Sequence, residues 1–276
     1  MKKAKVLFVS QDITPYLDET YIGKISRRLP QGIQERGKEI RTFMPKYGNI
    51  NERRHQLHEV IRLSGMNLVI NDVDHPLIIK VASIPSARMQ VYFIDNEEYF
   101  SRKSTLTDKT SGKHFDDNDE RCMFFVRGVV ETVKKLGWQP DIIHCHGWFT
   151  SLLPMYIKKY YADEPLFAES KIAVSVYNDE YPKNLNKKFV DKLGFDGFNK
   201  KDLKHLIEET NHVNMQKQAI EYADAVIQGD ETLNTDIEKY IKKTGKPFLA
   251  YKNEIEYLDA FNEFYDSILQ EVDVLS

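Results

Sequence analysis

A short segment near the middle of the chain holds three residues of the kinds that bind metals or act as nucleophiles. It reads His144-Cys145-His146, and Trp148 follows. In a β-strand the two histidines point to one side and the cysteine to the other, so the three do not converge on one ion. A cysteine buried in a strand is usually unreactive. We therefore expect no metal site: the histidines either line a polar pocket or are hydrogen-bonded in the core, and Trp148 either stacks on a sugar ring or packs under a helix.

The segment 10–20, after the first predicted strand, lacks the features of a phosphate-binding loop. It contains no glycine, whereas a dinucleotide-binding turn needs glycines so that the backbone can approach the pyrophosphate. Asp18 and Glu19 fall where the next helix is predicted to begin. Two carboxylates suit the positive end of a helix, but they would repel a phosphate. The segment therefore predicts the first turn of a helix and no anion site.

A run of carboxylates, Asp116-Asp117-Asn118-Asp119-Glu120, precedes another predicted helix. We expect it to cap that helix and to fill its first turn. The run lacks the spacing and the glycine of a calcium-binding loop. The sequence also contains no Gly-x-Ser-x-Gly nucleophile elbow.

The order of apolar segments predicts an α/β fold. Apolar strands that alternate with helices form a parallel, Rossmann-like sheet with helices on both faces. The predicted strands of this sheet are 5–10, 39–44, 141–145, 171–176 and 225–228. The predicted helices are 22–37, 116–136, 152–160, 213–222 and 232–242. Four β-rich runs, at 60–63, 66–70, 77–84 and 89–94, predict an antiparallel meander that continues the sheet or is inserted in it, and an exposed loop follows at 101–116.

Two of the helices have features of their own. Pro30 inside the first helix predicts a kink or a break, because proline lacks an amide hydrogen and its ring clashes with the preceding turn. The last helix, at about 254–272, has an apolar stripe at helical spacing from Tyr257 to Val272. We expect residues 1–276 to form a single domain that this helix closes.

Composition excludes several classes of protein. The chain has 276 residues, a formal charge of −3 and 41% hydrophobic residues, as is typical of globular proteins. No apolar run reaches the ~18 residues of a membrane-spanning helix, and the apolar part of the basic N-terminus is too short for an export signal. The two cysteines are no disulfide framework. We therefore expect a cytoplasmic protein with no cofactor, no membrane partner and, given the near-neutral charge, no nucleic-acid partner.

Charge is distributed unevenly between the two ends of the chain. Residues 1–50 contain ten basic and five acidic side chains, whereas residues 251–276 contain one basic and seven acidic ones. This contrast favours two solvated faces of opposite charge, which would attract each other.

The carboxyl ends of the strands are the place to look for a ligand, because parallel α/β sheets bind ligands there. Six segments fall at these ends: 10–19, 47–51, 95–98, 144–150, 177–181 and 229–231.

Several of these segments carry motifs that together resemble one family. They are Met44-Pro45-Lys46-Tyr47-Gly48 ("MPRYG" in the family), Asp117-Asn118 with Arg121 ("DNxxRF"), Pro140–Trp148 ("PDVVHAHDW"), Val176-Tyr177-Asn178 ("VHN") and Ala223–Val226 ("ADxV"). In this order and spacing, the chain resembles the N-terminal domain of bacterial glycogen and starch synthases, the family-five retaining glucosyltransferases of GT-B fold. The resemblance implies half of a GT-B fold and a role in α-glucan metabolism. The catalytic C-terminal domain of the family lies outside it.

The resemblance also implies a sugar-binding site at the strand ends. The candidate residues are Asp12, Asp117, His144, His146, Trp148, Tyr177 and Asn178.

Three positions depart from the family at its donor site. Asp18 stands where the family has the lysine that holds the donor's phosphates, Gly147 where it has an aspartate, and Tyr177 where it has a histidine. Replacing a cation by an anion reverses an interaction of roughly 4 kcal/mol at ~4 Å and an effective dielectric near 20. The resemblance therefore implies the family's fold with a weakened donor site and no catalytic residue among these positions.

Three hypotheses follow for the function. The chain could be a non-catalytic, synthase-derived domain that binds an α-glucan or small sugar or regulates a partner enzyme. It could be an active glucosyltransferase that uses ADP-glucose and an α-1,4-glucan once a partner chain supplies the second domain. It could also be an interaction protein without a sugar ligand, since a fold does not determine a function.

Overall fold

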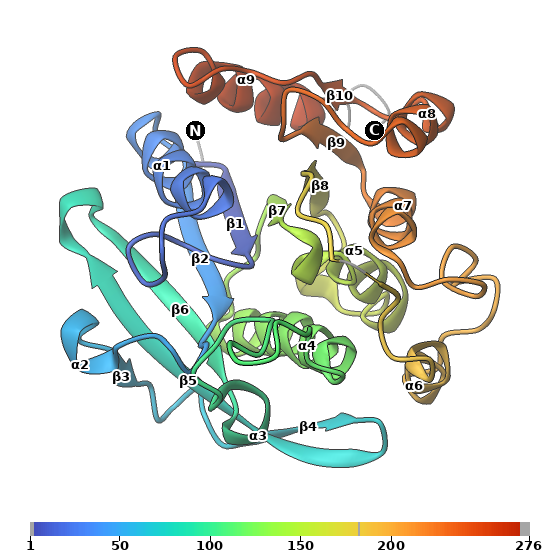
Figure 1. Ribbon diagram of the computed structural model, residues 1–276. Helices are drawn as coiled ribbons and strands as arrows, with labels where there is room; N and C mark the ends of the chain where they lie inside the picture. Colours follow the sequence, from blue (N-terminus) through green and yellow to red (C-terminus); the bar gives the residue numbers. More distant parts are fainter. Residues whose placement is uncertain (1–2, 182, 271–276) are drawn as a thin grey trace.

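The computed structural model describes residues 3–181 and 183–270, which form a mixed β-sheet with helices on both faces (Figure 1). The strands are β1 (Lys5–Ser10), β2 (Glu39–Pro45), β3 (His58–Glu59), β4 (Met66–Ile70), β5 (Val73–Ile84), β6 (Met89–Asp95), β7 (Ile142–His146), β8 (Lys171–Val176), β9 (Ala225–Gln228) and β10 (Phe248–Leu249). The α-helices are α1 (Tyr21–Glu35), α2 (Glu52–His55), α3 (Glu97–Phe100), α4 (Asn118–Leu136), α5 (Leu153–Met155), α6 (Phe189–Phe195), α7 (His212–Tyr222), α8 (Thr235–Thr244) and α9 (Tyr257–Gln270). The predicted α/β class is confirmed.

The strand order places a crevice at the centre of the sheet. Among the described residues the order is β10-β9-β8-β7-β1-β2-β6-β5-β3, with β4 paired to β5. From β10 to β6 all neighbours are parallel. The chain moves outward from β1 to β2 in one direction and from β7 to β8 and β9 in the other. The connections therefore part between β1 and β7, where ligands of doubly wound sheets bind beyond the strand ends.

The antiparallel extension differs in detail from the predicted meander. β5 pairs antiparallel with β3, β4 and β6, whereas β6 also pairs parallel with β2 and so joins the two parts of the sheet. The strand predicted at 60–63 is wrong. This segment forms a turn, in which the Leu63 amide donates a hydrogen bond to the Val60 carbonyl at 2.9 Å. The short β3 lies just before it.

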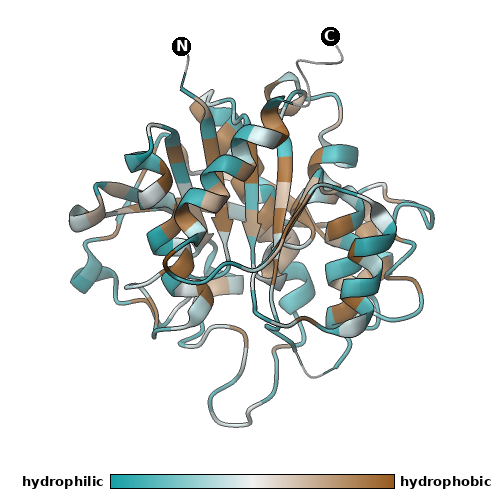
Figure 2. Cartoon of the chain, turned by 90° about the horizontal axis from the view of Figure 1, so that it is seen from above, coloured by the Kyte–Doolittle hydropathy of each residue, from teal (hydrophilic) through white to brown (hydrophobic). Residues whose placement is uncertain are grey.

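Side chains of β1 alternate between two apolar layers. Leu7 and Val9 belong to a core that includes the buried faces of α4, α5 and α7, whereas Val6 and Phe8 belong to a second core beneath α1 and α9. Figure 2 shows the apolar strands lying between helices with hydrophilic outer surfaces. A strand buried on both faces explains why these segments are continuous apolar runs in the sequence.

The oppositely charged ends of the chain meet where α1 packs against α9. Arg36 pairs with Asp259 at 2.6 Å, and Lys38 pairs with Asp266 at 2.7 Å. The predicted attraction between the two ends is therefore confirmed. The two helices also lie close together, because a Cβ atom placed on Gly32 would lie only 2.5 Å from a methyl group of Leu258.

Two expectations for the first helix, a break at Pro30 and a start at Asp18 and Glu19, are wrong. Pro30 does not break it, since α1 is continuous from Tyr21 to Glu35. Pro30 is buried, and the tertiary packing of α1 outweighs one lost hydrogen bond. Asp18 and Glu19 are not in the first turn. Thr20 is the N-cap and accepts a hydrogen bond from the Gly23 amide at 2.8 Å, a role in which a hydroxyl is strongly favoured.

The helices predicted at 152–160 and at about 254–272 are both present, with different limits. The helix predicted at 152–160 is α5 followed by a π-helical turn over Tyr156–Tyr160. The predicted closing helix is α9, and Val272 of its expected stripe lies outside the described residues. Within residues 3–181 and 183–270 no helix is both long and apolar enough to cross a bilayer.

Candidate functional site

A pocket of about 320 Å³ opens at the carboxyl ends of β1, β8 and β9. We call it the strand-end pocket. It is lined by Gln11, Asp12, Thr20, Tyr21, Ile22, Tyr177, Asn178, Asp179 and Asp230. Three of the predicted sugar-binding residues, Asp12, Tyr177 and Asn178, therefore meet there. The pocket lies beside the crevice, where the Gln11 amide donates to the His146 carbonyl at 3.0 Å across the ends of β1 and β7.

Asp12 is a buried carboxylate with one oxygen left for a ligand. Only 8% of its surface is exposed. One oxygen accepts the Thr20 hydroxyl at 2.7 Å, while the other is buried and has no partner among the described residues. Burial raises the pKa of Asp12 to about 6, with a smaller contribution in the same direction from the charge of Asp179. At neutral pH Asp12 is mostly ionised, so it can accept a hydrogen bond from a ligand hydroxyl.

Two further aspartates make the pocket strongly acidic. Asp179 accepts hydrogen bonds from the Trp148 amide at 2.6 Å and from the His212 ring at 3.0 Å. Asp230 accepts one from the Asn178 amide at 2.6 Å, and burial raises its pKa. No lysine or arginine is among the described residues that line the pocket. Both aspartates fall in the predicted strand-end segments 177–181 and 229–231, but no sequence motif singles them out.

Tyr177 points into the core and forms the floor of the pocket. Its hydroxyl is bonded to Nδ1 of His146 at 2.8 Å. Its ring lies against the chain at Gly229, because a Cβ atom there would be only 2.3 Å from the ring. The tyrosine at the family's histidine position thus packs against the chain just after β9. The ring of Tyr21, 39% exposed, meets it edge-on at 6.2 Å.

The two predicted histidines lie in the core under α9. Nδ1 of His144 is 2.6 Å from the Tyr265 hydroxyl and 3.2 Å from Nε2 of His146, and its Nε2 is 2.8 Å from the Ser175 hydroxyl. Both rings are fully buried. Burial lowers the pKa of His146 to about 3 and that of His144 well below its usual value, so both are neutral at pH 7. They support Tyr177 from below, and their own contact with a sugar stays a prediction.

Trp148 and Asp117 lie away from the pocket. Trp148 is buried against Tyr181, with ring centroids 4.6 Å apart. Asp117 occupies the N-cap position of α4, but its side chain makes no capping bond. Its carboxylate instead pairs with Arg102 through two contacts of 2.6 and 2.9 Å. The predicted cap at 116–120 is therefore correct in place, while the side chain of Asp117 serves a loop contact.

The remaining departures from the family have a structural basis. Gly147 has φ +86° and ψ 155°, a combination that is essentially restricted to glycine. A Cβ atom there would be 2.4 Å from the side chain of Gln11. Asp18 is exposed and does not line the pocket, and the neighbouring Glu19 pairs with Lys24 at 2.6 Å.

Comparison with known proteins shows the family to which this chain belongs. A family model described as the starch synthase catalytic domain matches residues 5–246. The chain belongs to the starch synthase family. The glycogen synthase of Chlorobium luteolum is 36% identical over 238 residues, which cover 84% of this chain and 48% of that protein. The glycogen synthase of Chlorobaculum tepidum is 32% identical over 271 residues, which cover 91% of this chain and 53% of that protein.

A solved structure supports the same fold. The catalytic domain of starch synthase IV from Arabidopsis thaliana, described as bound to ADP and acarbose, superimposes with a TM-score of 0.73 at 20% identity. The match covers 91% of this chain and 52% of that one. This member of the starch synthase family thus has the GT-B half-domain architecture, and it spans about half the length of the relatives it matches.

Two other observations concern what the chain could hold. In the part of the chain that the structure describes, no group of three or more His, Cys, Asp or Glu residues is placed to hold a metal ion.

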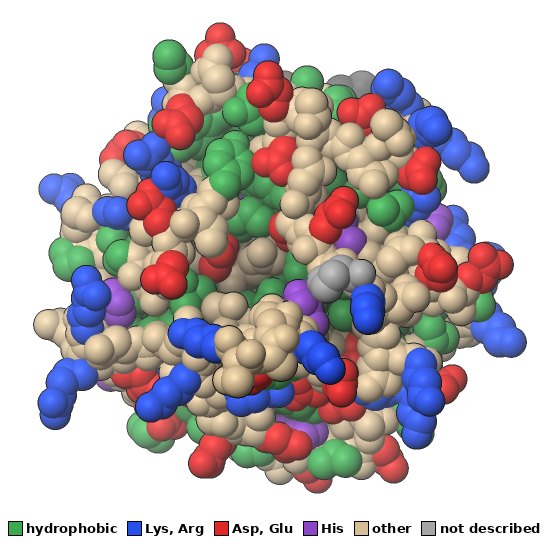
Figure 3. Space-filling view, in the orientation of Figure 1, with side chains coloured by type: hydrophobic (Ala, Val, Ile, Leu, Met, Phe, Trp, Pro, Cys, Tyr) green, Lys and Arg blue, Asp and Glu red, His purple; other side chains and the backbone are tan. Residues whose placement is uncertain are grey.

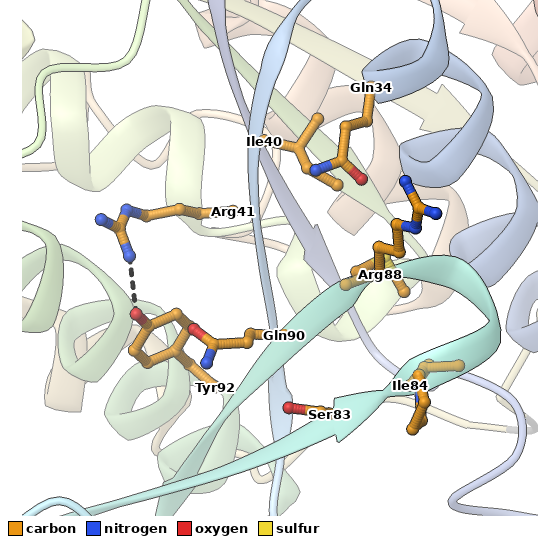
Figure 4. Close-up of a pocket in the computed structure, with 10 residues that line it drawn as sticks. Gln34, Ile40, Arg41, Ser83, Ile84, Arg88, Gln90 and Tyr92 are labelled. Atoms are coloured by element: carbon orange, nitrogen blue, oxygen red, sulfur yellow. Dashed lines mark hydrogen bonds between the residues drawn. The ribbon is translucent and has the colours of Figure 1, made fainter.

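A separate hollow of about 520 Å³ lies over the amino-terminal halves of β2 and β6 (Figure 4). There Arg41 points to one side and donates to the Tyr92 hydroxyl at 2.6 Å, whereas Arg88 points to the other, toward Gln34. The polar groups of this hollow therefore do not converge on one ligand.

Proposed function

We propose that this chain is a synthase-derived domain of α-glucan metabolism that binds the hydroxyl groups of a glucan or small sugar in the strand-end pocket. We further propose that it does not by itself transfer glucose from ADP-glucose. The observation that carries both statements is the convergence of Asp12, Asp179 and Asp230 on a pocket whose described lining contains no basic residue.

The charge of the pocket argues against a nucleotide-sugar donor. When glucose leaves a nucleoside diphosphate, negative charge develops on the phosphate, and an enzyme stabilises it with cations or with aligned amide groups. Here three carboxylates line the pocket, and an aspartate replaces the family's phosphate-binding lysine at position 18. The three carboxylates of the pocket would repel ADP and its developing charge, and Asp18, which lies outside the pocket, supplies no cation to offset them.

The same groups suit a neutral sugar. Carboxylates accept hydrogen bonds from hydroxyl groups, and the free oxygen of Asp12 is buried without a partner among the described residues, which is costly unless a ligand supplies one. Asn178 is exposed at the rim, and Tyr21 presents part of an aromatic ring. A volume of about 320 Å³ is at the small end of the range for ligand pockets. The Arabidopsis structure is described as bound to acarbose as well as to ADP, and we propose that only sugar binding is retained here.

An active transferase is the alternative. It is favoured by the family, because the relatives that match are named glycogen synthases and are about twice as long as their matched parts. In that case another polypeptide segment would have to supply the nucleotide-binding half, and the completed site would have to bind ADP.

Calorimetry with maltotriose and with ADP separates the two. We expect maltotriose to bind and ADP to give no heat at 5 mM. Radiolabelled glucose should not pass from ADP-glucose to glycogen. Asp230→Ala should weaken maltotriose binding at least fivefold, because it removes a carboxylate from the pocket. The matched control is Asp163→Ala, which changes an exposed aspartate outside the pocket.

Each outcome has a distinct meaning. ADP binding or glucose transfer would contradict the non-catalytic part of the proposal. No heat with 10 mM maltotriose, or equal affinity in the wild type and the Asp230→Ala variant, would contradict sugar binding in this pocket. The melting temperature of each variant shows whether it is folded.

A further inference from the structure

A second hollow lies at the same edge of the sheet, between the loop that leads into α4 and the loop that follows β8. Its volume is about 680 Å³. We call it the loop groove. Residues 112–116 form one wall and residues 183–187 the other, with Tyr181 at the base. Figure 3 shows lysine and arginine side chains grouped on this part of the surface, around the loop in front of α4.

The charge of the loop groove is opposite to that of the strand-end pocket. Lys113 stands on one wall, and Lys183 and Lys187 stand on the other. All three are exposed, and none has a carboxylate within 4.0 Å among the described residues. Asp116 is the acidic residue of the described lining. Burial lowers the pKa of His114, which keeps it neutral at pH 7. Three lysines and one aspartate therefore give the groove a net charge of +2.

The walls of the groove are held in place by contacts that leave the lysines free. The Tyr181 hydroxyl donates to the Thr210 carbonyl at 2.7 Å. Phe115 packs under the guanidinium of Arg102, which lies 4.1 Å from the ring centroid. Asn186 joins the two walls by donating to the Asp116 carbonyl at 3.3 Å. The groove is thus a supported cavity with a cationic rim.

The polar and apolar groups of the lining indicate the kind of ligand. Phe115 and Leu185 supply apolar surface, and Asn184 supplies an amide that can bind a hydroxyl group. Lysine ammonium groups bind phosphate as point charges. A phosphate monoester carries close to two negative charges at neutral pH, which matches the net charge of the groove. The cavity volume lies within the range for small ligands.

We propose that the loop groove binds a phosphate monoester carried on a sugar. The phosphate lies between Lys113, Lys183 and Lys187, and the sugar lies toward Asn184 and the apolar base. This inference is independent of sugar binding in the strand-end pocket, because no residue lines both sites. It adds an anion site to a domain whose central pocket repels anions.

The first experiment measures glucose 1-phosphate, inorganic phosphate and maltose in separate calorimetric titrations of the full chain at low salt. Glucose 1-phosphate should bind most tightly and inorganic phosphate at least threefold more weakly, because it lacks the sugar contacts. Maltose, which has no phosphate, is the control. The affinity of the protein for maltose should not change when the groove lysines are substituted. No binding of glucose 1-phosphate at 10 mM would overturn the proposal. Equal affinity for phosphate and glucose 1-phosphate would overturn the sugar part of it.

Charge reversal on both walls locates the binding. The Lys113→Glu and Lys187→Glu double variant should weaken glucose 1-phosphate at least tenfold. Lys188→Glu is the matched control, since Lys188 is exposed and adjacent to Lys187 but does not line the groove; it should change the affinity less than twofold. An equal loss in both variants would indicate general surface attraction and overturn the proposal.

Asp116→Asn should tighten binding about twofold. The Asp230→Ala variant should still bind glucose 1-phosphate, so failure of the groove and failure of the strand-end pocket can be told apart.

Discussion

The strand-end pocket and the loop groove lie at the same edge of one sheet, and the loop after β8 contributes to both, yet they differ in charge and in burial. Asp12 in the pocket is buried, and its pKa is raised to about 6. The lysines of the groove are exposed and unpaired among the described residues. The pocket thus carries its charge at a cost to folding, whereas the groove carries its charge on the surface at little cost.

This difference follows from what builds each site. The pocket is formed by residues directly after β1, β8 and β9, whose positions are set by the parallel pairing of the strands. The groove is formed by two long loops, whose side chains can change without disturbing the sheet. In this chain the sign of charge therefore differs between two parts of the same sheet edge without any change in the strand pairing.

The largest expected effect comes from restoring the family's aspartate beside the pocket. Gly147→Asp forces a side chain into a backbone conformation with φ +86° and into contact with Gln11. The conformation costs about 1–3 kcal/mol, and overpacking adds about 1–3 kcal/mol. We expect the free energy of unfolding, measured with urea, to fall by about 3 kcal/mol or more.

The double variant Gln11→Ala with Gly147→Asp separates the two causes. It removes the clash but keeps the backbone strain, so it should recover part of the loss. If Gly147→Asp alone is as stable as the wild type, the close contact between Gly147 and Gln11 does not constrain the chain beside the strand-end pocket. The pocket would then be no more rigidly built than the loop groove.

The next effect tests whether burial of Asp12 destabilises the fold. A carboxyl whose pKa is raised on folding binds its proton more tightly in the folded protein, so stability falls as the pH rises from 4 through about 6. Asp12→Asn removes this penalty. We expect the variant to be more stable than the wild type at pH 7.5 by about 2–3 kcal/mol, at 1.36 kcal/mol for each pKa unit.

The control for this prediction is the pH dependence itself. The advantage of Asp12→Asn should shrink toward pH 4 and disappear at about pH 3, where the wild-type carboxyl is protonated in both the folded and the unfolded chain. An advantage that is the same at pH 4 and pH 7.5 would assign it to packing instead of charge. The same variant should bind maltotriose more weakly, because an amide presents one acceptor oxygen in place of two.

The regular part of this fold was predictable because its strands are short apolar runs between polar turns. The limits of β1, β8 and β9 agree with prediction residue for residue. The prediction failed where an apolar run does not pair. Residues 60–63 look like a strand, but their amides bond within a turn. The helix α6 was missed because it is only seven residues long and has no extended apolar period.

The lining of the strand-end pocket was predictable only where a residue directly follows a strand. Asp12 and Asn178 could be named because they come just after β1 and β8. Asp230 meets Asn178 through the pairing of β8 with β9, a contact between residues 52 positions apart that no local pattern shows. Lys113 and Lys187 are still further apart in sequence, and their loops have no periodicity. The burial of His144 and His146 depends on α9, which follows them by more than a hundred residues.

The smallest expected effect distinguishes the two sites by salt. Exposed charges are screened within about 10 Å at 0.1 M ionic strength and about 3 Å at 1 M, whereas partly buried groups are screened much less. Raising sodium chloride from 0.05 to 0.5 M should therefore weaken glucose 1-phosphate binding about fivefold to tenfold. Maltotriose binding should change less than twofold, because a neutral sugar in the strand-end pocket is held by hydrogen bonds. Calorimetry at four salt concentrations measures both slopes. Parallel slopes would mean that the two ligands share one site, and the contrast between the acidic pocket and the basic groove would then have no functional meaning.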